Sequence, residues 1–156
     1  LSTYVTNRLE VKDIKKLIRV SKEEEIWELQ KAITSGQVSC AIKKLNELQE
    51  ISGYPSTLII WSVMEMLKKV YEASLLFSKK ENIQAIKKKC NMWGSSGEKM
   101  LFLASKNSSL KISLLLNKTL KQVESIRSGK MGSQVGLEMI IISVTQNLNA
   151  KGETSK

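Results

Sequence analysis

The longest apolar segment of the chain reads PSTLIIWSVMEMLKKVYEASLLFS and spans residues 55–78. Pro55, the only proline, stands at its start, where a helix tolerates proline because the first N–H groups lack an intrahelical partner. Within 58–67 only Ser62 and Glu65 are polar. A helix so apolar around its circumference is expected to lie at the centre of the molecule and to be mostly buried.

Amphipathic segments on both sides of this central helix predict an all-α protein. Apolar residues recur at helical spacing before it over about 21–34 and 38–51, and after it over about 83–90, 98–106, 109–127 and 133–148. Polar or glycine-containing turns separate them, including a loop over 91–97. One proline, eight glycines and few aromatic residues argue against a β-sandwich or barrel. We therefore expect about five main helices plus short ones.

Several classes of catalytic site are missing from the sequence. The chain has no histidine, which excludes Ser-His-Asp triads, Cys-His dyads and histidine-ligated metals. Cys40 and Cys90 form no CxxC motif and are expected to be reduced, buried thiols. The glycine-rich stretches 94–97 and 128–134 lack the spacing of a phosphate-binding loop. We expect no enzyme activity, no cofactor and no metal, and the absence of an 18-residue apolar run predicts no membrane span.

The positive charge is concentrated in one third of the chain. The net charge is +10, and residues 79–130 carry 12 Lys/Arg against 3 Glu, whereas residues 1–78 carry 11 basic and 10 acidic residues. Such an asymmetry is typical of proteins that bind a polyanion. The alternative is that these lysines only solvate the outer faces of helices.

Trp93 is the one aromatic residue near this basic stretch that stands in a predicted loop. Lysines that follow a phosphate backbone, together with a ring that stacks on a base, are the parts of a single-strand binding site. The candidate nucleic-acid-binding residues are therefore Trp93, Lys87, Lys88, Lys89, Lys99 and Lys130. In this interpretation Trp93 is partly exposed; in the alternative its indole is buried between short helices. Trp27 and Trp61 lie on apolar helix faces and are expected in the core.

The order of these features resembles a known family. RLEVKDIKKLI (8–18) is followed by SKEEEIWELQKAITSGQVSCAIKKLNEL (21–48), and Tyr54-Pro55 then opens the long apolar helix. Over about residues 8–148 this order resembles the C-terminal part of the delta subunits of bacterial DNA polymerase III, which belong to the clamp loader.

The resemblance implies a domain organisation and a function. Residues 1–20 would end a middle, lid-like helical domain, and residues 21–149 would form a C-terminal helical collar domain. Independently of the resemblance, residues 150–156 are expected to be a disordered tail, as is common at chain termini. The collar would be a non-catalytic assembly domain that binds the other clamp-loader subunits in a pentamer, which places the sliding clamp on primed DNA. The chain would lack its own ATPase, be monomeric in isolation and work in the bacterial cytoplasm.

Contact with DNA is a further implication, because some delta subunits carry a tryptophan where this chain has Trp93. Such contact would be weak and would involve single-stranded template. The alternative from a different class is a free-standing helical module that binds single-stranded nucleic acid.

Overall fold

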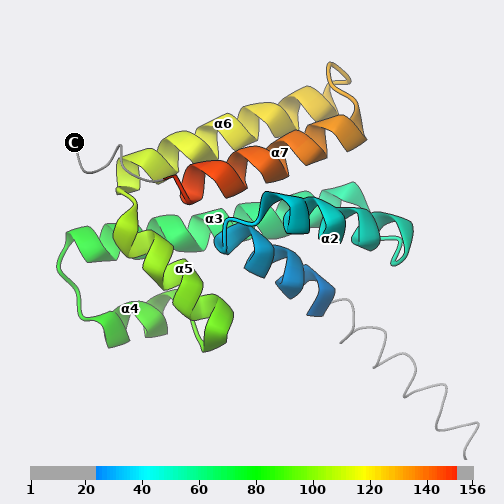
Figure 1. Cartoon of the computed structure of the whole chain (residues 1–156). Coiled ribbons are helices and arrows are strands. Elements are labelled where there is room, and N and C mark those ends of the chain that lie inside the picture. The colour runs from blue at the N-terminus through cyan, green and yellow to red at the C-terminus, as the bar shows by residue number, and fades with distance from the viewer. Residues whose placement is uncertain (1–23, 151–156) are drawn as a thin grey trace, which may run out of the picture.

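The computed structural model describes residues 24–150, and in that part every regular element is a helix (Figure 1). The all-α prediction is therefore confirmed for this range. The predicted middle-domain fragment at 1–20 lies outside the described residues, as does almost all of the predicted tail at 150–156.

Seven helical segments follow one another along this range. Residues 24–34 are helical, and the remaining helices are α2 (Val38–Glu50), α3 (Ser56–Ser78), α4 (Ile83–Cys90), α5 (Gly94–Lys106), α6 (Ser109–Arg127) and α7 (Ser133–Leu148). The expected bounds that fall within the described residues agree to within about one residue except at α5; the expected start at Ser21 lies outside them. The loop predicted over 91–97 is wrong, since α5 already begins at Gly94. Two residues with positive φ, Asn91 at 54° and Gly94 at 76°, make the short reversal between α4 and α5 possible.

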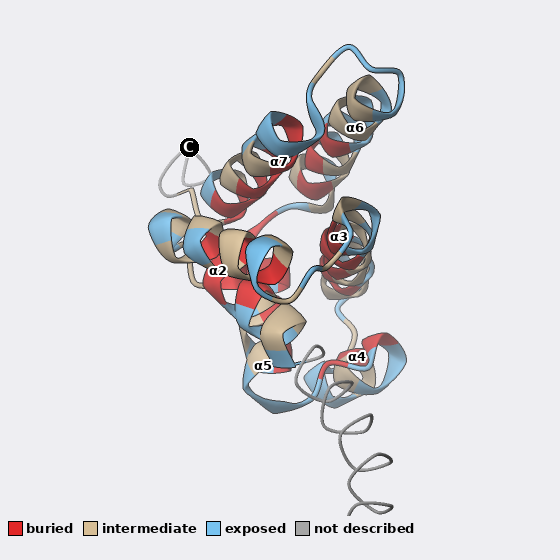
Figure 2. Ribbon diagram, turned by 90° about the vertical axis from the view of Figure 1, so that its right-hand side faces the viewer, coloured by how far each residue is buried: buried red, intermediate tan, exposed pale blue. Residues whose placement is uncertain are grey.

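Helix α3 occupies the centre of the structure. It packs against α4, α5, α6 and α7, and Figure 1 shows the antiparallel pair α6–α7 on one side of it and α4 with α5 on the other. Its buried stripe includes Ile59, Val63, Leu67 and Val70, at the spacing of a helix face. The central position is confirmed. The expectation that α3 is mostly buried is wrong along one side, where apolar residues remain exposed (Figure 2).

Two apolar residues of the predicted amphipathic segments, Leu120 and Ile83, are also exposed. Leu120 lies about 100° around α6 from buried Thr119, outside the narrow stripe that α6 presents to α3 and α7. Ile83 is the first residue of α4, and the buried residues of that short helix are Ile86 and Cys90, one and two turns further on. A prediction from apolar residues alone therefore makes the packed faces of α6 and α4 wider than they are.

Two side-chain amides tie the end of α7 to neighbouring elements. Asn149 Nδ2, just after α7, donates a hydrogen bond to the backbone oxygen of Ile33 at 2.9 Å. Buried Asn107 Nδ2, just after α5, donates to the backbone oxygens of Leu103 at 2.9 Å and Leu148 at 3.0 Å. The end of α7 thus anchors both the α5–α6 connection and the helix that bears Trp27.

Candidate binding groove

All three tryptophans of the chain are exposed. The exposed fraction is 60% for Trp27, 63% for Trp61 and 55% for Trp93. The core positions predicted for Trp27 and Trp61 are therefore wrong, whereas the partial exposure of Trp93 is confirmed.

Helix geometry explains why both predictions failed. At 100° per residue, a side chain two positions away points about 160° around the helix. Trp27 is two residues from fully buried Leu29, and Trp61 is two residues from fully buried Ile59 and Val63. Each tryptophan therefore lies opposite the packed face of its own helix.

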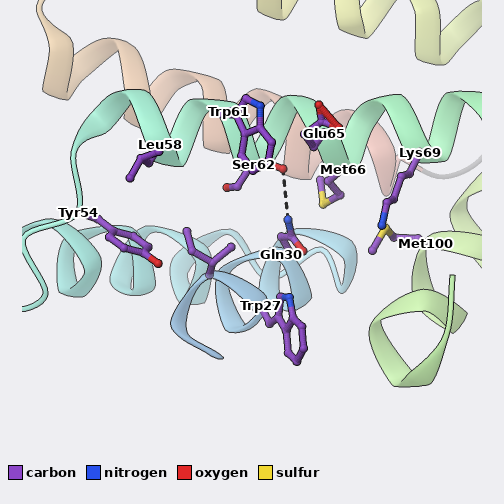
Figure 3. A pocket seen from close by; sticks show the side chains of 11 residues that line it. Trp27, Gln30, Tyr54, Leu58, Trp61, Ser62, Glu65, Met66, Lys69 and Met100 are labelled. Carbon is purple, nitrogen blue, oxygen red and sulfur yellow. Dashed lines mark hydrogen bonds between the residues drawn. The ribbon is translucent and has the colours of Figure 1, made fainter. Parts of the chain in front are cut away.

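A groove of about 530 Å³ lies between the helical residues 24–34 and α3 (Figure 3). In the figure, Trp61 stands on α3 at one side and Trp27 stands on the other helix at the opposite side. Between them, Gln30 Nε2 donates a hydrogen bond to the backbone oxygen of Ser62 at 3.2 Å. The lining residues are Ile26, Trp27, Gln30, Tyr54, Leu58, Trp61, Ser62, Glu65, Met66, Lys69 and Met100.

A second hollow of about 710 Å³ adjoins the first and reaches the α4–α5 connection. The two share Trp27, Gln30, Lys69 and Met100. The second is lined in addition by Glu24, Glu28, Lys31, Asn91, Trp93, Gly94, Ser95, Ser96 and Gly97. We call the combined surface the tryptophan groove. It contains every tryptophan of the chain.

The α4–α5 connection holds Trp93 in the groove by burying its neighbour. Met92 is almost fully buried, and Trp93 follows it with extended backbone as the N-cap of α5. A Cβ atom at Gly97 would lie 2.4 Å from the backbone carbonyl carbon of Met92, so only glycine allows the first turn of α5 to approach this closely. The role of Met92 as an anchor was not predicted.

Acidic and basic side chains both line the tryptophan groove. Its lining includes three carboxylates, Glu24, Glu28 and Glu65, against two ammonium groups, Lys31 and Lys69. Outside the lining, Lys44 Nζ lies 2.5 Å from Glu28 Oε2, and this hydrogen bond is the main cause that raises the pKa of Lys44. Lys68 Nζ likewise lies 3.7 Å from Glu65 Oε1, so two of the three carboxylates are paired with lysines outside the lining and the groove has no acidic excess.

The predicted lysines do not form one basic surface around Trp93. Lys87 forms an ion pair with Glu98, and Lys89 Nζ lies 2.6 Å from Glu81 Oε1. The hydrogen bond from Lys89 is the first cause of a lowered pKa of Glu81, followed by its charge. Two of the three lysines of α4 are therefore neutralised locally.

The remaining predicted lysines are scattered. Lys88 is exposed, and no salt bridge is found for it within the described residues. Lys99 Nζ donates a hydrogen bond to Ser35 Oγ. Lys130 lies in the connection between α6 and α7, at the end of the molecule away from α4 and α5 (Figure 1). None of the five predicted lysines lines the tryptophan groove.

The other chemistry of the described range is sparse. Residues 24–150 hold no group of three or more acidic, cysteine or histidine side chains placed to bind a metal ion. None of the helices in this range has the length and apolar character needed to cross a membrane. What this range offers is a wide aromatic surface suited to binding.

No family model, no curated protein and no solved structure matches the chain.

Proposed function

We propose that the chain is a non-catalytic assembly domain that binds other proteins through the tryptophan groove. The observation that carries this proposal is the exposure of Trp27, Trp61 and Trp93 along one groove. Tryptophan is enriched among the residues that dominate protein–protein binding energy, and large exposed apolar patches are rare on monomeric proteins without such a role.

The most specific form of this proposal follows from the sequence resemblance. The chain would be the collar domain of a delta-type clamp-loader subunit in the bacterial cytoplasm, and its partners would be the collars of the other loader subunits. What supports it is the order of elements after Tyr54-Pro55 on which the resemblance rests, in which a long helix is followed by two shorter ones, α4 and α5, and then by two long ones, α6 and α7. In this role the domain holds the loader together and hydrolyses no ATP.

Co-purification with the other clamp-loader subunits tests this function. Wild-type chain is expected to elute with them, and a Trp27→Ala/Trp61→Ala variant is expected to elute separately. Phe102→Ala is the matched control, because Phe102 is an aromatic residue with an exposed fraction of 62% that does not line the groove. Failure of the wild-type chain to associate at micromolar concentrations would contradict the clamp-loader assignment.

A second candidate function, contact with single-stranded DNA, is favoured by one observation. Trp93 is exposed at the end of the groove nearest α4, whose Lys88 is also exposed. Stacking of a base on an aromatic ring contributes roughly 1–3 kcal/mol. Trp93→Ala should then weaken binding of a thymidine oligonucleotide, while Phe102→Ala should not.

A further inference from the structure

We draw no further inference here: the strongest candidate, the tryptophan groove between the helical residues 24–34 and α3, is the site already described, and nothing in the structure shows what covers it.

Discussion

Gln30 and Ser62 join the two walls of the tryptophan groove through a hydrogen bond of 3.2 Å from Gln30 Nε2 to the backbone oxygen of Ser62. The bond lies between Trp27 and Trp61 in Figure 3. It links residues 32 positions apart in the sequence, so it holds the helical residues 24–34 against α3 between the two tryptophans.

Removal of this bond should loosen the groove without unfolding the protein. Gln30→Ala is expected to lower the free energy of unfolding by about 0.5–1.5 kcal/mol, the usual net contribution of one hydrogen bond. Urea denaturation followed by circular dichroism measures this change. Gln134→Ala is the control, because Gln134 is exposed and its side-chain hydrogen bond goes to Glu138, one turn away within α7. Equal effects of the two variants would contradict a special role for Gln30.

Truncation of the tryptophans should change stability little. Trp27→Ala, Trp61→Ala and Trp93→Ala each remove a largely exposed side chain, and we expect each to cost about 1 kcal/mol or less. Leu67→Ala, at a fully buried position of α3, should cost about 2–5 kcal/mol. Thermal melting curves separate the two groups. A Trp61→Ala protein that melts as early as Leu67→Ala would show that Trp61 is a core residue.

The close approach at Gly97 gives a prediction about the position of Trp93. In Gly97→Ala the new methyl group would meet the Met92 backbone, and we expect a loss of about 1–3 kcal/mol together with a shifted Trp93 environment. Ser95→Ala, at an exposed position in the same turn, should be neutral or slightly stabilising. Denaturation curves and the fluorescence of a Trp27→Phe/Trp61→Phe background measure both effects. A neutral Gly97→Ala would contradict the packing of α5 on Met92.

The two cysteines should differ in their reaction with thiol reagents. Cys90 is buried, and burial is the first cause that raises the pKa of its thiol, followed by the charge of Glu72. A raised pKa lowers the thiolate fraction at any pH below it, so Cys90 should react slowly at pH 8 and faster as the pH increases. Cys40 is only half-buried and should react first. Single Cys→Ala variants assign the two phases, and a fast phase that remains in Cys40→Ala would contradict this order.

The helices could be predicted because the spacing of their apolar residues and the capping residues at their ends indicate the same segments. Asn82 and Ser108 cap α4 and α6 with their side chains, as their positions before those segments suggest. The first turn of α5 was missed because Gly94-Ser95-Ser96-Gly97 has poor helix propensity, and its packing on the Met92 backbone outweighs that preference.

The groove was missed for a different reason. Trp27 and Trp61 are apolar, and the sequence alone does not reveal that the opposite faces of their helices already supply the core. The sequence did hold one indication: Trp27 is two residues from Leu29, and Trp61 is two residues from Ile59. Two residues at that spacing point to opposite sides of a helix, so both members of a pair cannot lie on one narrow buried face. The pairing of Lys87 with Glu98 and of Lys89 with Glu81 depends on tertiary placement, so the charge count overestimated the basic surface.

If the tryptophan groove is the assembly surface of this domain, partner binding must change the surroundings of Trp27 and Trp61. Incorporation of 5-fluorotryptophan gives one fluorine resonance for each of Trp27, Trp61 and Trp93, and alanine variants assign them. Addition of unlabelled clamp-loader subunits is expected to shift or broaden the Trp27 and Trp61 resonances in proportion to the complex formed. A complex that forms while both resonances stay unchanged would contradict the claim.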